Sequence, residues 1–310
     1  MAAPHEFLTD QEKRDLGFGA VMSNRPGLRL LNRDGSFNVR RRRNGVRERL
    51  HDYVGLLTMP WPAFFAMLVG TYLALNALFA ALYLLCGPDA LAGGGRASFA
   101  RAFFFSVHTF ATIGYGNIVP ATLGANILVT IESMVGLISF ALATGIIFSR
   151  FARPTAHIIY SRRAIVAPYR GITAFMFRII NGRDNELINL EARVMLTRFE
   201  MIDGQPQRRY YTLALERERV AFFPLNWTIV HPIEPSSPLA GWNQEQLLAS
   251  NAEFLILLTG TDDTVAQTVH SRSSYSAAEV EWGVRFAPLV GGDGGLLTVD
   301  MAQFHKILPA

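Results

Sequence analysis

Two long apolar runs dominate the pattern of hydrophobic and polar positions along the chain. Residues 62–85 carry no charge, and residues 126–149 carry one ionisable side chain, Glu132. Each run exceeds the roughly 20 apolar residues that a helix needs to cross a bilayer. The second run is followed by basic residues and Pro154, which favour a helix end there. The pattern predicts two transmembrane helices, over residues 62–85 and 124–151.

A short apolar segment and a glycine-containing loop lie between the two runs. Residues 99–110 are typical of a short helix, and residues 112–116 contain two glycines. Irregular backbone at membrane depth is tolerated only where it is buried in protein or lines water. We therefore expect a re-entrant pore helix over 99–110 and a filter loop over 112–116, within a pore domain of residues 60–154.

An amphipathic stretch precedes the first run. Apolar residues over 46–59 recur at spacings of three and four, opposite charged ones. This pattern favours a slide helix in the membrane interface, and the neighbouring Trp61 favours the headgroup boundary. The alternative is an ordinary amphipathic helix packed on protein. Residues 1–45 are expected to form a loosely structured N-terminal segment.

After Pro154 the pattern changes to short runs rich in β-branched and aromatic residues. Turn clusters such as residues 181–184 and 202–206 separate these runs. Regular short strands with such turns predict an all-β sandwich over residues 155–310. The runs expected to form strands are residues 172–180, 192–199, 209–215, 227–233, 253–259 and 280–286.

Composition and charge agree with a membrane protein. Hydrophobic residues make up 50% of the 310 residues, charged residues make up 17%, and the mean hydropathy is +0.21. The net charge of +4 includes basic clusters within residues 40–49 and 150–163. Both clusters flank a membrane run, which follows the positive-inside rule and argues against nucleic-acid binding. We therefore expect both termini in the cytoplasm.

The filter loop carries the candidate chemistry. Stacked backbone carbonyls of such a loop replace the hydration shell of potassium. Successive carbonyls point to one side only if the backbone alternates in hand, and Gly114 and Gly116 accept left-handed conformations at little cost. We expect the Thr112 hydroxyl to add the innermost ring of oxygens. The Tyr115 side chain is expected to point away from the ion and to brace the filter against the pore helices. The carbonyls expected to bind K⁺ are those of Thr112, Ile113, Gly114 and Tyr115.

Taken alone, a pentapeptide of this kind is compatible with a simple turn. Its place between two membrane spans favours the filter, because no soluble turn needs such flanks. One chain supplies a quarter of a central filter, so function implies a closed ring of four copies, a homotetramer.

Several segments resemble the inward-rectifier potassium channel family, and most of all its prokaryotic branch. The resemblance runs from residue 50 to about residue 304. It implies an immunoglobulin-like, tetrameric cytoplasmic domain that prolongs the ion path, and a place in the bacterial inner membrane. The segments that carry it are residues 56–61, 102–107, 112–116, 148–154, 273–275 and 281–286.

Gating is expected at two places. Phe148 falls at the family's hydrophobic bundle crossing, where a ring of four Phe could close a pore by dewetting. Its alternative role is packing or contact with lipid. Gly136 and Gly145 are either hinges or sites of close helix packing. A second, cytoplasmic constriction of the family, where a glycine is common at the first position, aligns with Ala266, Gln267 and Thr268.

Two residues of the second span bear on the pore cavity. Glu132 is ionisable inside the membrane, which is expensive unless the group is paired or wetted and therefore marks it as a functional candidate. It either contributes to the field near the filter or forms structural hydrogen bonds behind it. Phe140 stands where strongly rectifying relatives carry an acidic residue, so we do not expect steep rectification.

His108 and Ile118 depart from the family pattern together. Relatives commonly have a Glu at the first position, and animal members have an Arg at the second, so both halves of that buried ion pair are absent. We expect His108 to be a hydrogen-bonding structural residue. The alternative is that its titration beside the filter makes conductance pH-dependent.

Four arginines are candidate ligands for anionic lipid headgroups, or else only fix the topology. The resemblance implies phosphoinositide sensitivity. However, Thr155 and Ala156 replace basic residues of animal members, which leaves the sign of that effect open. The candidate lipid-binding residues are Arg47, Arg49, Arg150 and Arg153.

These observations predict a passive, gated potassium channel rather than an enzyme. The β region shows no nucleophile–base pairing, metal-ligand spacing or phosphate-binding glycine loop, and we expect no cofactor beyond K⁺ as the transported ion. The single Cys86 cannot form an intramolecular disulfide. The alternative is a membrane-anchored receptor whose β-sandwich binds a ligand, although this leaves the filter loop unexplained.

Overall fold

The computed structural model divides the chain into two units. One comprises residues 42–153, and the other comprises residues 1–41 and 154–310. We call them the pore unit and the β unit. The structure describes residues 17, 27–39, 53–93, 95–152, 156–183, 185–223, 226–293 and 296–310.

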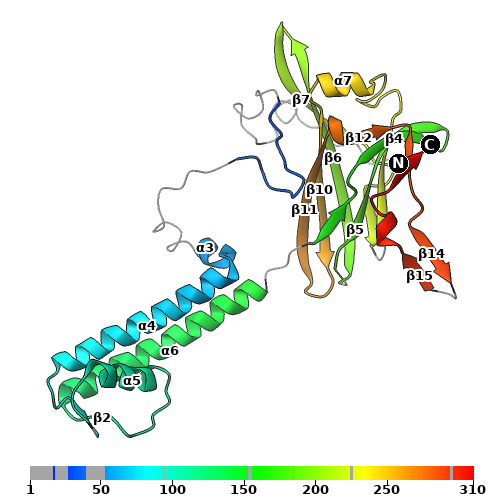
Figure 1. Cartoon of the computed structure of the whole chain (residues 1–310). Helices are drawn as coiled ribbons and strands as arrows, with labels where there is room; N and C mark the ends of the chain where they lie inside the picture. The colour runs from blue at the N-terminus through cyan, green and yellow to red at the C-terminus, as the bar shows by residue number, and fades with distance from the viewer. Residues whose placement is uncertain are drawn as a thin grey trace, which may run out of the picture. The chain divides into compact units, whose positions relative to one another are not determined.

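The pore unit contains two long helices that run alongside each other, with a short third helix at one end (Figure 1). The long helices are α4 (Trp61–Leu85) and α6 (Leu123–Phe151), and the short one is α5 (Phe99–Phe110). Both long helices are long and apolar enough to cross a membrane. Their limits differ by one residue at the N-terminal end from those expected, and α5 has the expected limits.

Local signals set where these helices begin. Pro62 lies in the first turn of α4, where its missing N–H would have no helical partner. The Ser98 hydroxyl accepts a hydrogen bond from the Arg101 N–H at the start of α5, and the Thr122 hydroxyl does the same for Ala125 at the start of α6. A two-stranded ribbon of β1 (Leu91–Ala92) and β2 (Val119–Pro120) joins the loops on either side of α5.

Before α4 lies the short helix α3 (Tyr53–Thr58), which has no buried residue. The slide helix was expected over residues 46–59, so α3 covers its C-terminal part. Residues 46–52 lie outside the described residues.

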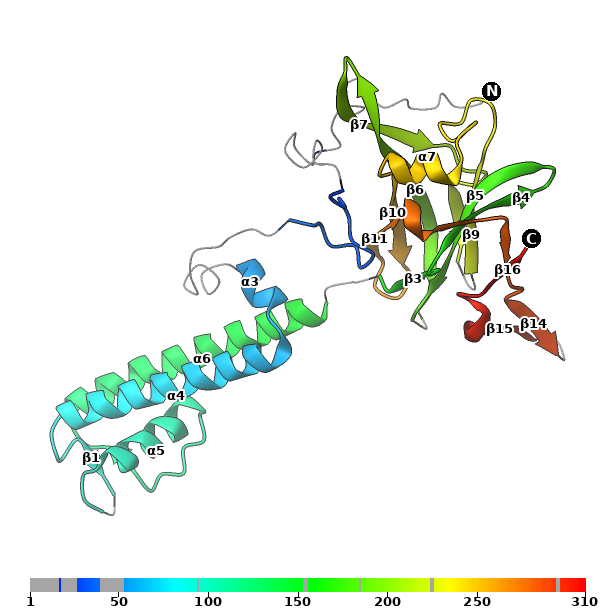
Figure 2. The same cartoon turned by 45° about the horizontal axis from the view of Figure 1, so that its top comes forward.

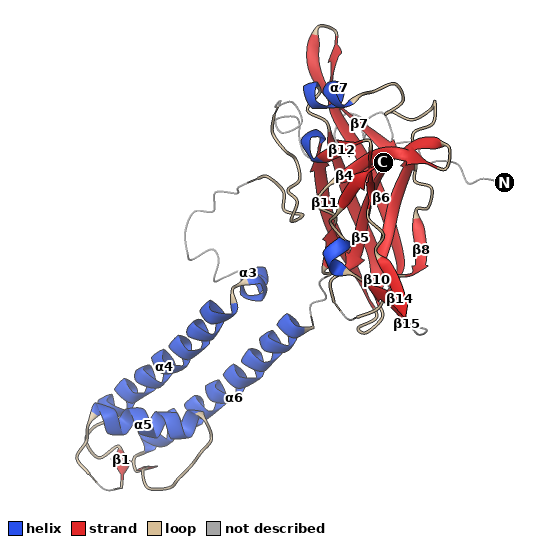
Figure 3. Cartoon of the chain, turned by 45° about the vertical axis from the view of Figure 1, so that its right-hand side comes forward, coloured by secondary structure: helices blue, strands red, loops and turns tan. Residues whose placement is uncertain are grey.

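The β unit contains two five-stranded sheets that form a sandwich, drawn in red in Figure 3. In the first sheet β6 is central, with β10 on one side and β7 and β8 on the other; β11 pairs with β10. Its strands are β6 (Leu187–Ile202), β7 (Gln205–Leu213), β8 (Arg219–Phe222), β10 (Glu253–Asp262) and β11 (Gln267–Ser276).

In the second sheet β5 is central, flanked by β9 on one side and by β3 and β4 on the other, and β12 pairs in parallel with β4. Between the two sheets lies the main apolar core, which includes Phe175, Phe177 and Phe254. The strands are β3 (Ile158–Tyr160), β4 (Ala164–Tyr169), β5 (Ile172–Asn181), β9 (Asn226–Pro232) and β12 (Val280–Trp282).

Smaller elements complete the β unit (Figure 2). The ribbons β13–β16 and β14–β15 lie near the C-terminus, and α7 precedes β10. Their bounds are α7 (Gln244–Ala249), η1 (Ala277–Glu279), β13 (Val284–Phe286), β14 (Val290–Asp293), β15 (Leu296–Val299), η2 (Met301–Gln303) and β16 (Ile307–Pro309).

The fold class expected from the sequence, two membrane helices with a re-entrant helix and loop followed by a β-sandwich, is confirmed. Two expectations about the β unit were wrong. The run 280–286 forms two strands rather than one, because Gly283 between them has a left-handed φ of +67°. The N-terminal segment was expected to be loose, yet Leu30 and Leu31 are buried against the sandwich beside Leu255.

Candidate functional site

The loop after α5 has a backbone whose hand alternates from residue to residue. The φ angles of Thr112, Gly114 and Gly116 are +56°, +62° and +78°, whereas Ile113 and Tyr115 lie outside the left-handed region. Such alternation lets successive carbonyls face the same side, which a carbonyl-lined ion site requires. The glycines were expected to take this conformation, but the positive φ of Thr112 was not.

The C-terminal end of α5 holds the first half of the loop. The Thr112 N–H donates to the Thr109 carbonyl at 3.0 Å. The His108 carbonyl accepts from the N–H groups of Ile113, at 2.8 Å, and Gly114, at 3.3 Å. These contacts fix where the loop leaves the helix.

The Tyr115 side chain of the loop packs against the same helix. The rings of His108 and Tyr115 meet edge to face, with centroids 4.8 Å apart and planes at 87°. This matches the expectation that Tyr115 turns toward the pore helix. Ile118, the other position of the missing ion pair, packs beside the apolar cluster around Phe105.

Within one chain the loop has open surroundings. Residues 111–117 are all exposed, and a Cβ added at Gly114 or Gly116 would meet no atom within 4 Å. Glycine is therefore favoured at these two positions by the left-handed backbone conformation, and not by lack of space within the chain.

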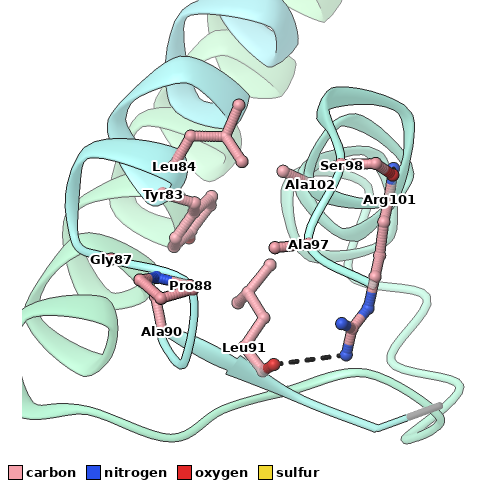
Figure 4. A pocket seen from close by; sticks show the side chains of 10 residues that line it. All are labelled: Tyr83, Leu84, Gly87, Pro88, Ala90, Leu91, Ala97, Ser98, Arg101 and Ala102. Atoms are coloured by element: carbon pink, nitrogen blue, oxygen red, sulfur yellow. Dashed lines mark hydrogen bonds between the residues drawn. The ribbon is translucent and has the colours of Figure 1, made fainter. Parts of the chain in front are cut away.

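Arg101, at the start of α5, braces the loop that precedes the helix (Figure 4). Its guanidinium donates to the carbonyls of Leu91 at 3.2 Å and Gly95 at 2.8 Å, and also to that of Gly93. A Cβ added at Gly93 would lie 2.0 Å from the Asn117 carbonyl oxygen, so this loop lies directly against the residue that follows the filter.

Glu132 on α6 is fully buried, where α6 meets α4 and α5. The Tyr83 hydroxyl donates to its Oε2 at 2.5 Å, and the Ser106 hydroxyl is hydrogen-bonded to its Oε1. Ser106 also lies 3.0 Å from Asn76 Oδ1, and the Asn76 amide donates to the Tyr72 carbonyl at 2.8 Å. These contacts favour the structural hydrogen-bonding role for Glu132, and the sequence did not single out its partners Tyr83 and Ser106, or Asn76 beyond them.

The other candidate positions on α6 differ in their surroundings. A Cβ added at Gly136 would lie 2.7 Å from the Phe110 carbonyl oxygen, whereas one added at Gly145 would have no neighbour within 4 Å. Gly136 is thus a site of close packing against the end of α5. Phe140 and Phe148 are largely exposed in the single chain.

Comparison with known proteins decides the family. The model of the inward rectifier potassium channel C-terminal domain matches residues 158–309, and a model described as ion channel matches residues 64–153. The inward rectifier potassium channel Kirbac3.1 of Paramagnetospirillum magnetotacticum is 40% identical over 285 residues, which are 90% of this chain and 95% of that protein. The chain belongs to the inward rectifier potassium channel family.

Two human proteins are more distant relatives of this inward rectifier chain. Inward rectifier potassium channel 4 is 32% identical over 221 residues, which are 67% of this chain and 49% of that protein. Inward rectifier potassium channel 18 is 30% identical over 224 residues, covering 67% of this chain and 50% of that protein. The chain therefore spans about half the length of either human relative. It is an integral membrane protein of ion transport and not an enzyme.

Arg150 of this inward rectifier chain is engaged inside the pore unit. Its guanidinium donates to the carbonyl of Met59 at 2.5 Å and to that of Leu56, and it lies 4.5 Å from the ring centroids of Trp61 and Phe64. It thus connects the C-terminal end of α6 to the junction between α3 and α4. The other candidate lipid-binding residues, Arg47, Arg49 and Arg153, lie outside the described residues.

The candidate second constriction is the turn between β10 and β11. Ala266 is the last residue of this turn and has a φ of +50°, and Gln267 begins β11, paired with Asp262. Thr268 follows and pairs with Thr261. A left-handed conformation suits glycine better than alanine, so Ala266 adopts a backbone conformation that costs free energy.

Proposed function

We propose that the chain forms a homotetrameric, potassium-selective channel of inward-rectifier type. The single observation that carries the proposal is the alternating hand of residues 112–116, which lie between two membrane helices in a chain of this family. The carbonyls of Thr112, Ile113, Gly114 and Tyr115 would line the ion sites, and the Thr112 hydroxyl would add the innermost ring.

The exposure of the filter loop supports a ring of four copies. An ion stripped of water needs oxygens on all sides, and one loop covers only one side. Residues 111–117 are exposed in one chain, so their remaining neighbours must come from other copies placed around a four-fold axis.

The gate is proposed at Phe148 on α6, with a second constriction formed by Ala266, Gln267 and Thr268. The exposed Phe148 ring is free to meet its copies at the axis, where an apolar ring closes a pore by dewetting. Gly145 has the space required of a hinge, whereas Gly136 does not. Phe140 gives the cavity no negative charge, and weak rectification follows.

The β unit and both termini are proposed to face the cytoplasm of a bacterium, with the pore unit in the inner membrane. Basic residues flank both spans on that side, as the positive-inside rule requires. Anionic lipids, including phosphoinositides, are proposed as modulators through Arg47, Arg49 and Arg153. Arg150 has already committed its guanidinium to backbone carbonyls, so its contribution to lipid binding is indirect.

Rubidium uptake into liposomes that contain the purified protein tests the proposal. We expect potassium and barium to suppress uptake and sodium to spare it, and we expect Gly114→Asp to abolish it. Equal suppression by sodium would overturn the selectivity. A detergent-solubilised mass near that of one chain would overturn the tetramer and return attention to a receptor.

A further inference from the structure

The hydrogen-bonded cluster around Glu132 has fewer protons than its contacts require if Glu132 is charged. Ser106 Oγ lies within hydrogen-bond distance of two acceptors, Glu132 Oε1 and Asn76 Oδ1, yet a hydroxyl carries one proton. Tyr83 uses its own proton on Glu132 Oε2. With a carboxylate, one of the two contacts of Ser106 would be a close approach of two oxygens with no proton between them.

Rotating the Asn76 amide does not supply the missing proton. Its Nδ2 donates to the Tyr72 carbonyl at 2.8 Å in the same helix. Exchanging the amide nitrogen and oxygen would satisfy Ser106 but would place two carbonyl oxygens 2.8 Å apart. The orientation of Asn76 is therefore set by Tyr72, and its Oδ1 must accept from Ser106.

Neither does a cation accompany Glu132. Glu132, Ser106 and Asn76 are fully buried, and the surrounding cluster is apolar, including Phe79, Ala80 and Phe105. Among the described residues, every ion pair lies in the β unit. A buried, unpaired carboxylate is among the most expensive arrangements in a protein.

We infer that Glu132 is an uncharged carboxylic acid that donates its proton to Ser106, which in turn donates to Asn76. Tyr83 donates to the remaining carboxyl oxygen. Every proton of this chain of hydrogen bonds then has one acceptor, and α4, α5 and α6 are joined by a neutral network. Glu132 is a positioning residue in this arrangement: it holds the pore helix through Ser106 and places no negative charge behind the filter.

Glu132→Gln is the matched variant, because a neutral amide reproduces both roles of the acid. Its N–H donates to Ser106 and its oxygen accepts from Tyr83. We expect this variant to keep the melting temperature of the detergent-solubilised tetramer and the rubidium uptake of the wild type. Glu132→Ala leaves the Tyr83 hydroxyl without its acceptor and removes the donor to Ser106, so it should lower the melting temperature by several degrees. A Gln variant as unstable as the Ala variant would overturn the inference.

An infrared difference spectrum, wild type minus Glu132→Gln, reads the proton directly. We expect the carbonyl stretch of a protonated carboxylic acid at neutral pH. Carboxylate stretches in its place would overturn the inference, even if the variant folds and conducts. Neither this spectrum nor the melting temperature depends on conduction, so a failed rubidium assay would count against the proposed function and not against this inference.

Asn76→Leu adds a test of similar side-chain volume. If Ser106 donates to Asn76, the variant removes an acceptor and should lower the melting temperature. If Glu132 were charged, the variant would relieve an oxygen–oxygen contact and raise the melting temperature instead.

Discussion

The pore unit and the β unit each bury a glutamate, and they stabilise it in different ways. Glu253 in β10 accepts from the backbone N–H groups of Leu30 at 2.9 Å and Leu31 at 3.1 Å, and it lies 3.8 Å from the Arg208 guanidinium. Glu132 contacts hydroxyls of neighbouring helices. The difference follows from the backbone: helices use their own N–H groups internally, whereas an incoming loop segment has N–H groups to offer.

Each arrangement has its own consequence for the fold. Burial raises the pKa of Glu253, and the two N–H groups and Arg208 oppose that rise. Glu253 thereby fastens residues 28–39 to a sandwich that is distant in sequence. Glu132 joins three helices that are already close, and in a membrane such polar contacts are stabilising because water is absent.

The largest expected effect is that of Glu253→Ala. It removes the acceptor of two buried N–H groups and leaves Arg208 without this partner, which costs about 3 kcal/mol of unfolding free energy. Hydrogen exchange should show loss of protection at the Leu30 and Leu31 amides. The control is Glu191→Ala, whose more exposed ion pairs with Arg193 and Arg219 should matter little. Retained protection in Glu253→Ala would contradict the anchoring role.

In the pore unit, Gly136→Ala should have the next largest effect. The added Cβ would lie 2.7 Å from a backbone carbonyl, so α5 and α6 must separate, at a cost of about 2 kcal/mol. Gly145→Ala on the same helix meets no atom within 4 Å and should leave the melting temperature nearly unchanged. Equal losses from both variants would show that helix flexibility, rather than packing, decides.

Arg150→Gln tests whether the end of α6 is held from within. Losing the contacts to Leu56, Met59 and the Trp61 ring should cost between about 1 and 2 kcal/mol in thermal unfolding. The control from the β unit is Arg170→Gln, which loses an exposed ion pair with Glu216 and an exposed contact with the Tyr169 ring and should change little. If binding to anionic vesicles falls while stability is unchanged, Arg150 is a direct lipid ligand after all.

Ala266→Gly should stabilise the β unit. Alanine pays for a left-handed φ of +50° that glycine adopts freely, and the gain is about 1 kcal/mol. The matched control is Val265→Gly in the same turn, where no left-handed φ is present and glycine should destabilise. A lower melting temperature for Ala266→Gly would show that the left-handed conformation of Ala266 is not a source of strain.

The smallest effect concerns pH and His231. Its Nδ1 lies 2.6 Å from the Ala214 carbonyl oxygen, and burial lowers the pKa of His231 below its usual 6.5. The unfolded chain therefore takes up the proton first, so the stability that is present above pH 6.5 is lost as the pH falls below it. His231→Asn keeps a donor for Ala214 but does not titrate, and its melting temperature should fall less between about pH 7.5 and pH 5.5.

Part of the loss of stability at low pH should remain in His231→Asn. Burial also lowers the pKa of His305, so this residue adds stability loss of the same sign. An unchanged pH dependence in His231→Asn would show that His231 is not a source of it.

The membrane helices were predictable to within a residue, whereas the strands were not. Long uncharged runs leave few alternatives in a bilayer, and Ser98 and Thr122 mark helix starts locally. In the β unit, β3, β4, β8 and the ten-residue β11 were not expected, because strand formation depends on partners elsewhere in the chain. The docking of Leu30 and Leu31 had no periodic signal, since it depends on a carboxylate that lies 222 residues or more away.

The amino-acid sequence alone indicated the family, the two membrane spans and the filter loop. The length and charge of the apolar runs identify the spans, and the glycines between them identify the loop, because these signals are local in the sequence. Folding in three dimensions decided the roles of Gly136, Arg150 and Glu132. Each depends on atoms from another helix: the Phe110 carbonyl, the end of α3, and the hydroxyls of Tyr83 and Ser106. The type of a residue determines which interactions its side chain can form, whereas tertiary packing determines which partner it contacts.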